Sequence, residues 1–103
     1  MNARDTSYTD TLREALKNPE EAAAFIDAAI EQGDSAALLV ALRHVAAAHG
    51  MAEITRAAGM GEKTLFQTLS DKGNPTLQTL VRVLAAMGLR LSVAPAEAQH
   101  ASA

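Results

Sequence analysis

The chain has 103 residues, of which 49% are hydrophobic, and its formal net charge is −3 at pH 7. This length suits one small domain with a modest core, and the absence of cysteine excludes disulfides and thiolate metal sites. No apolar run approaches the roughly 20 residues that a membrane span needs, and the polar N-terminus lacks the apolar stretch of a signal peptide. We therefore expect a cytoplasmic protein with no membrane partner.

The first half of the chain is expected to form a flexible arm followed by three helices. Residues 1–9 show no clear period and predict the arm, and two leucines on one face predict a short helix over 10–17. Asn18 is a good N-cap for an amphipathic helix over 19–32, and a similar apolar face predicts a helix over 35–49.

Residues 51–70 predict a helix-turn-helix. A short helical pattern over 51–58 precedes the turn Gly59-Met60-Gly61, and a second helical pattern follows over 62–70. In DNA-binding proteins built this way, the second helix enters the major groove. A plain helical bundle explains the apolar spacing equally well, so the polar face of the second helix carries the argument for DNA binding.

The second helix of this motif has an apolar side and a polar side. At about 100° per residue, Leu65, Phe66 and Leu69 cluster together and are expected to anchor the helix. The candidate base contacts on the opposite side are Lys63, Thr64 and Gln67. Lysine can pair with guanine and glutamine with adenine, and threonine can contact a thymine methyl group.

The loop after the motif adds two candidate contacts to the DNA backbone. Lys72 and Asn74 lie just before a predicted helix over 76–87. The backbone amides at the start of that helix, together with the lysine, could hold a phosphate.

The C-terminal part of the chain predicts a strand and a tail. Leu89, Leu91 and Val93 alternate with polar residues, which is a strand pattern. A lone strand leaves unpaired backbone groups, so it needs a partner, which is a second copy of itself, another protein or the N-terminal arm. We expect a homodimer in which these three residues form the dimerisation surface. The Ala-rich residues 94–103 predict a disordered tail, which leaves a single helical domain over 10–93.

Charge is divided unevenly along the chain. Residues 1–49 hold four basic and eight acidic residues, whereas residues 50–90 hold five basic and three acidic ones. The helix-turn-helix half is therefore only weakly basic. Because phosphate neutralisation supplies much of the affinity of a DNA-binding protein, this half is expected to need dimerisation to bind tightly.

No pattern in the sequence indicates catalysis, a metal or a cofactor. His44 and His49 are five residues apart, a spacing that does not place them side by side on a helix. The acidic residues gather at helix starts, where capping explains them. The chain also lacks a nucleophile signature and a glycine-rich phosphate loop, so we expect neither an enzyme nor a metal or cofactor site.

Several short runs between Tyr8 and Pro95 carry a family resemblance. They include Asn18-Pro19-Glu20-Glu21, Gly50-Met51-Ala52-Glu53-Ile54, Leu69-Ser70-Asp71-Lys72-Gly73-Asn74-Pro75 and Ala86-Met87-Gly88-Leu89-Arg90-Leu91. The order Leu-Ser-x-x-Gly-Asn-Pro is fairly specific. In these runs the chain resembles the addiction-module antidote proteins, a branch of the lambda-repressor-like (Xre-type) helix-turn-helix family that is often grouped with HigA-type antitoxins.

The resemblance implies an all-α, lambda-repressor-like domain of about five helices with a short C-terminal strand. It also implies the antitoxin of a type II toxin–antitoxin system, which neutralises a RelE/ParE-like toxin and represses its own operon by binding operator DNA as a dimer. Because toxins that act on ribosome-bound RNA tend to be basic, we expect the acidic first half to bind the toxin.

Two alternatives to an antitoxin remain open. One is a stand-alone Xre-type repressor without a toxin partner, which the neighbouring reading frame would distinguish. The other is a protein-interaction module that has lost DNA binding. Glu62 at the start of the second helix and the low basic charge make this second alternative conceivable.

Overall fold

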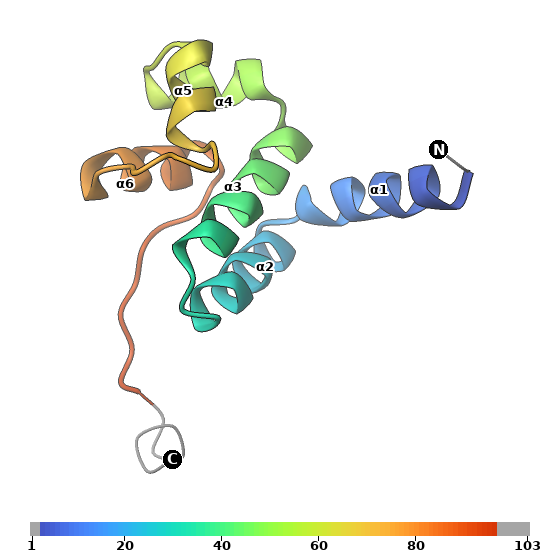
Figure 1. Cartoon of the computed structure of the whole chain (residues 1–103), viewed down its shortest axis with the longest axis horizontal. Helices are drawn as coiled ribbons and strands as arrows, with labels where there is room; N and C mark the ends of the chain where they lie inside the picture. The colour runs from blue at the N-terminus through green and yellow to red at the C-terminus, as the bar shows by residue number, and fades with distance from the viewer. Residues whose placement is uncertain (1–2, 97–103) are drawn as a thin grey trace.

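Figure 1 shows the computed structural model of the chain, which describes residues 3–96, with residues 3–7 described through their backbone alone. The described part holds six α-helices: α1 (Ala3–Leu16), α2 (Pro19–Glu31), α3 (Ser35–His49), α4 (Met51–Ala58), α5 (Glu62–Thr68) and α6 (Leu77–Ala86). The helical patterns in the sequence predicted six ranges, and the family resemblance implied about five helices. From α2 onward, the helices almost coincide with the predicted ranges.

The long helix α3 is the centre of the molecule. It packs against α1, α2 and α4, and α6 packs in turn against α4. The buried side chains of α3 include three large residues and three alanines: Leu39, Ala41, Leu42, Val45, Ala46 and Ala48. Because alanines leave room for close approach, burial in a chain with few aromatic residues is achieved by packing the helices tightly.

Side-chain caps fix where three of the helices begin. The Asn18 side-chain oxygen accepts hydrogen bonds from the backbone amides of Glu20 and Glu21, at 2.8 and 3.1 Å, which confirms the predicted cap of α2. Asp34 caps α3 in the same way, and Thr76 caps α6. Each such cap stabilises its helix by about 1 kcal/mol.

The N-terminal segment corrects the expectation of a flexible arm. Helix α1 begins at Ala3, so residues 3–9 continue the helix that was expected to start at residue 10. Leu16 at its far end is only 2% exposed, whereas Tyr8 is 70% exposed, and α1 projects sideways from the other helices (Figure 1). The lack of an apolar period before residue 10 is therefore explained by a helix whose described side chains there, residues 8–10, are exposed to solvent. Residues 1–2 lie outside the described part.

The expected C-terminal strand is the second correction. Within the described residues there is no strand, and the chain after Gly88 runs away from α6 without regular secondary structure (Figure 1). The Leu89 amide still bonds to the Leu84 carbonyl at 2.8 Å, which ends the helix. A strand requires a paired neighbour, and one copy of this chain supplies none there. Residues 94–96 are irregular, and the rest of the predicted tail, 97–103, lies outside the described part.

The described helices are short compared with a membrane span. Among the described residues, no single helix is both long and apolar enough to cross a bilayer. Helices α3 and α4 meet that test only when taken together, across a bend of 102°.

Candidate functional site

Helices α4 and α5 form a compact pair joined by a tight turn. Helix α4 ends at Gly59, whose φ of 70° lies in the left-handed region that glycine adopts without strain. Ile54 and Leu65 are both fully buried, one from each helix. The turn and these two contacts fix the direction of α5 and leave its other side open to solvent.

The open side of α5 presents the polar residues that the sequence singled out. Lys63, Thr64 and Gln67 are all exposed, and within the described residues Lys63 takes part in no ion pair. The structure thus brings these three side chains together on one short helix, where they are accessible to a large partner.

Phe66 departs from its expected role as an anchor of α5. Its side chain is 56% exposed, whereas Leu65 and Leu69 are at most 1% exposed. The helical wheel explains the difference, because Phe66 lies at the edge of the apolar arc, next to Lys63. Leu65 and Leu69 fill the space beneath α5, and the phenyl ring is left at the surface.

The loop after α5 is held against α3 by an arginine. Arg43 donates a hydrogen bond to the backbone carbonyl of Leu69 and a second one to the Asp71 carboxylate, the latter at 3.2 Å. This fork spans from the middle of α3 to the loop that carries Lys72 and Asn74, both of which are exposed. One side chain therefore positions the two candidate backbone contacts relative to α5.

The role of Arg43 in holding this loop was not predicted from the sequence. A signal was present, since Arg43 is the only Lys or Arg in α3, a helix made mainly of alanine, leucine and valine. A charged residue in such a helix usually has a specific partner, because burying a charge without one is costly. The pattern could not name the partner, which lies 28 residues further along the chain.

Gly73 is required in the same loop by close packing. A Cβ atom at this position would lie 1.9 Å from the Thr68 carbonyl oxygen, which is far inside van der Waals contact. The loop therefore turns directly against the end of α5. Only glycine permits this approach without moving the backbone.

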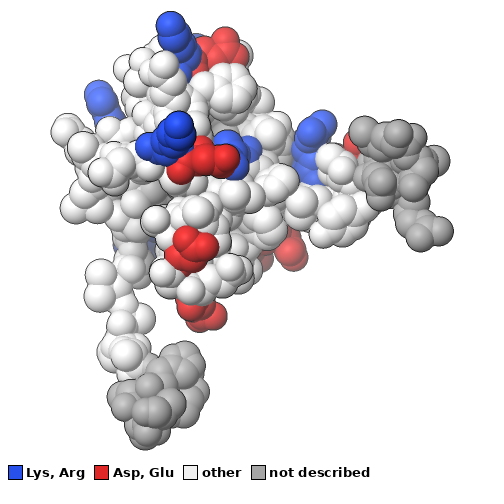
Figure 2. All heavy atoms as spheres, in the orientation of Figure 1, with Lys and Arg blue, Asp and Glu red and all other residues white. Residues whose placement is uncertain are grey.

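Ion pairs around α4 and α5 neutralise two of the nearby acidic groups. Glu53 pairs with Arg56 within α4, and Asp71 pairs with Arg43. The view in Figure 2 shows basic and acidic side chains side by side over the α4–α5 end of the molecule, and acidic ones without basic neighbours over the end where α2 and α3 meet. Glu62 remains as an exposed acidic group at the start of α5.

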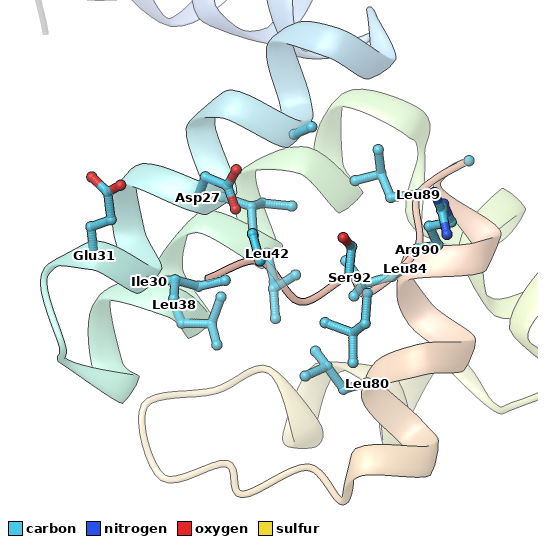
Figure 3. Close-up of a pocket in the computed structure, with 15 residues that line it drawn as sticks. Asp27, Ile30, Glu31, Leu38, Leu42, Leu80, Leu84, Leu89, Arg90 and Ser92 are labelled. Atoms are coloured by element: carbon cyan, nitrogen blue, oxygen red, sulfur yellow. The ribbon is translucent and has the colours of Figure 1, made fainter. Parts of the chain in front are cut away.

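A second feature is an open groove between α2, α3, α6 and the extended chain after Gly88. Its volume is about 600 Å³. Figure 3 shows that apolar side chains from the three helices point into the same space; they are Ile30, Leu38, Leu42, Leu80 and Leu84. Asp27 and Glu31 lie along its α2 side and Arg90 lies opposite. The groove thus combines an apolar floor with an acidic edge.

The three residues expected at a dimer surface do not share one environment. Leu89 is partly buried and packs against the core. Leu91 is 39% exposed beside the groove, and Val93 is 98% exposed. The exposed pair leaves apolar surface on a segment whose backbone, within the described residues, has no strand partner.

The two histidines of α3, His44 and His49, have different surroundings. The rings of His44 and Phe25 meet edge to face, with their centroids 6.0 Å apart. His49 has a buried ring nitrogen, Nε2, without a hydrogen-bond partner in the described structure. Within residues that the structure describes, no group of three or more potential ligands comes together to hold a metal ion.

Comparisons with known proteins agree on one relationship. A family model described as "Probable addiction module antidote protein" matches residues 7–95. An uncharacterized protein of Haemophilus influenzae is 32% identical over 80 residues, which cover 78% of this chain and 82% of that relative. No solved structure matches the chain significantly.

Proposed function

The chain belongs to the family of probable addiction module antidote proteins, and from this premise we propose that it is the antitoxin of a type II toxin–antitoxin system. In this proposal it binds and neutralises a RelE/ParE-like toxin and represses its own operon as a homodimer on operator DNA. The role is one of binding and involves no reaction. The observation that carries the DNA-binding part is the exposed polar face of α5.

In this DNA-binding role α4, the turn and α5 act as a lambda-repressor-like helix-turn-helix. Lys63, Thr64 and Gln67 contact base edges in the major groove. Lys72 and Asn74 contact the DNA backbone, which sets the register without reading sequence. The ion pairs of Glu53 and Asp71 support this assignment, because each carboxylate is paired with an arginine, and within the described residues neither is paired with Lys63 or Lys72.

Alanine substitutions on α5 test this role. We expect Lys63→Ala and Gln67→Ala each to weaken binding to the upstream DNA by about 1–3 kcal/mol, the range for a good base contact. The measurement is a gel-shift titration at two salt concentrations with nonspecific competitor DNA. Lys17→Ala and Gln32→Ala are matched controls that change the same residue types on the other side of the molecule. If all four variants bound the upstream DNA as tightly as the wild type does, the assignment of α5 to DNA binding would be refuted.

The toxin-binding role is proposed for the acidic half of the chain. Between Lys17 and Arg43 the sequence has no Lys or Arg, and its five acidic residues are Glu20, Glu21, Asp27, Glu31 and Asp34. Two of these border the apolar groove. An apolar floor beside several carboxylates suits a segment of a basic protein that carries apolar side chains on one face.

Charge reversal tests the toxin surface better than deletion. Removing residues 1–33 would also remove the core residues Leu16 and Ile26, so loss of function would not be specific. We expect the double variant Asp27→Lys/Glu31→Lys to lose neutralisation of the toxin encoded beside the gene, while still binding DNA. Growth rescue in cells that express the toxin, together with a pull-down, measures this.

Glu62→Lys is the matched control for the toxin test. It reverses the same charge on α5, where it is expected to leave neutralisation intact and to strengthen DNA binding by removing a repulsion from phosphate. If the α2 variant kept full neutralisation, the toxin surface would lie elsewhere. If the gene had no adjacent small basic reading frame and the chain still bound DNA, a stand-alone repressor would replace the antitoxin.

A further inference from the structure

Phe66 is an exposed aromatic side chain on the helix assigned to DNA. The chain has only two phenylalanines; Phe25 is partly buried against the core, whereas Phe66 is 56% exposed on α5. Leaving a phenyl ring in water forgoes the free energy that its burial would contribute. An exposed ring on a candidate binding surface is therefore expected to have a partner outside the chain.

The neighbours of Phe66 on α5 define what that partner could be. At 100° per residue, the exposed arc of the helix runs from Glu62 through Phe66, Lys63 and Gln67 to Thr64. The apolar ring of Phe66 thus lies between the Glu62 carboxylate and a stretch that is cationic and amide-bearing. A target that fits it offers hydrogen-bonding groups and an isolated apolar group side by side.

The edges of base pairs in the major groove have this composition. Each carries acceptors or donors, and thymine adds a projecting C5 methyl group that apolar side chains, phenylalanine included, can contact. We propose that Phe66 reads a thymine methyl group next to the bases contacted by Lys63 and Gln67, and so helps to determine the operator sequence. This inference rests on the proposed DNA-binding role of α5.

A protein partner fits Phe66 less well. Phe66 is the only exposed large hydrophobic side chain on α4 and α5, and the next one along the chain is Leu77 at the start of α6. Protein interfaces usually bury their aromatic anchors within a contiguous apolar centre. A single ring among polar side chains and beside an unpaired lysine matches the mixed edge of a base pair instead.

The contact proposed for Phe66 would distinguish thymine from cytosine. Thymine and cytosine differ in the major groove by the methyl group and by the polarity of the neighbouring atom. A ring packed on the methyl group therefore favours thymine over cytosine at one position of each half-site. In a dimer, the two copies of Phe66 would apply this preference at two symmetric positions.

Methyl-free DNA tests the proposal directly. The upstream DNA is amplified once with dTTP and once with dUTP, which removes every thymine methyl group and keeps all hydrogen-bonding groups. We expect the wild-type protein to bind the uracil DNA about fourfold more weakly per methyl contact, from the value of one buried methyl-sized group. Phe66→Ala should bind thymine DNA more weakly by a similar factor and should no longer distinguish the two DNAs.

Tyr8→Ala is the matched control, because it removes an exposed aromatic ring that lies on α1 and outside the proposed DNA-binding surface. It should discriminate between the two DNAs as the wild type does. Phe66 lies outside the buried core, so circular dichroism should show Phe66→Ala folded; if that variant does not fold, Phe66→Leu takes its place and should discriminate less than the wild type.

The outcomes separate the inference from the function it rests on. Equal wild-type binding to both DNAs, or full discrimination by Phe66→Ala, overturns the role of Phe66 while leaving the DNA-binding protein intact. Absence of specific binding to thymine DNA overturns the proposed DNA-binding function, and the inference falls with it.

Discussion

At the scale of single residues, Arg43 connects the fold to the candidate site. Its guanidinium group satisfies the Leu69 carbonyl, which ends α5, and the Asp71 carboxylate in the following loop. A planar fork of donors can serve both acceptors at once, whereas a lysine ammonium group cannot match this geometry. The side chain is therefore expected to matter both for stability and for the position of the loop.

Arg43→Ala is predicted to lower the free energy of unfolding by about 1–2 kcal/mol, the range for losing a charged hydrogen bond to a partly buried acceptor. It should also weaken DNA binding, because Asp71 then faces the phosphates without its counter-charge. Denaturant unfolding and gel-shift titration measure the two effects. Arg56→Ala is the control for the unfolding measurement, since its exposed pair with Glu53 contributes at most about 1 kcal/mol.

A second substitution separates the two roles of Arg43. In the double variant Arg43→Ala/Asp71→Asn the repelling carboxylate is gone, so DNA binding should recover in part while stability stays low. Recovery of both properties together would mean that the Leu69 contact contributes little.

At the scale of elements, the close approach of the loop to α5 depends on Gly73. Gly73→Ala is predicted to destabilise the protein by about 1–3 kcal/mol, as overpacking typically does, because its Cβ would meet the Thr68 carbonyl. It should also displace Lys72 and reduce the salt dependence of DNA binding. Gly61→Ser is the control: nothing but the Thr64 hydroxyl lies within 4.0 Å of its Cβ, and serine is a slightly better N-cap.

The elements also show what the sequence could and could not predict. Caps and apolar periods are local, so the ranges of α2 to α6 and the polar face of α5 were predictable from neighbouring residues. The exposure of Phe66 was not predictable, because a residue at the edge of an apolar arc is buried or exposed according to which other elements pack against it. The prediction of a strand over Leu89–Val93 was wrong for a similar reason, since strand pairing depends on a partner that local sequence does not specify.

At the scale of the whole molecule, acidic side chains predominate over the end where α2 and α3 meet, whereas basic and acidic side chains are mixed over the α4–α5 end (Figure 2). The net charge of −3 is therefore the sum over two surfaces that differ in their charge. Both proposed partners, DNA and a basic toxin, would be attracted to their own end of the chain. Because Coulomb interactions between exposed groups are screened within about 10 Å at 0.1 M salt, we expect both interactions to weaken as salt is raised.

Dimerisation through the segment after Gly88 is also a prediction for the whole molecule. Val93→Lys should shift the protein toward monomer in sedimentation equilibrium without changing the unfolding free energy of the monomer, because Val93 is 98% exposed. Val40→Lys, on the partly exposed face of α3, is the control and should leave association unchanged. A wild-type protein that remains monomeric at micromolar concentration would rule out the proposed dimer.

The projecting helix α1 gives the chain a built-in optical probe. Tyr8 is its only tyrosine, and it has no tryptophan. The ring lies on the exposed part of α1, away from the buried core. Its fluorescence should therefore respond when a partner covers the N-terminal helices and should change little when DNA binds α5. Titrating one unlabelled sample with each partner would tell the two surfaces apart.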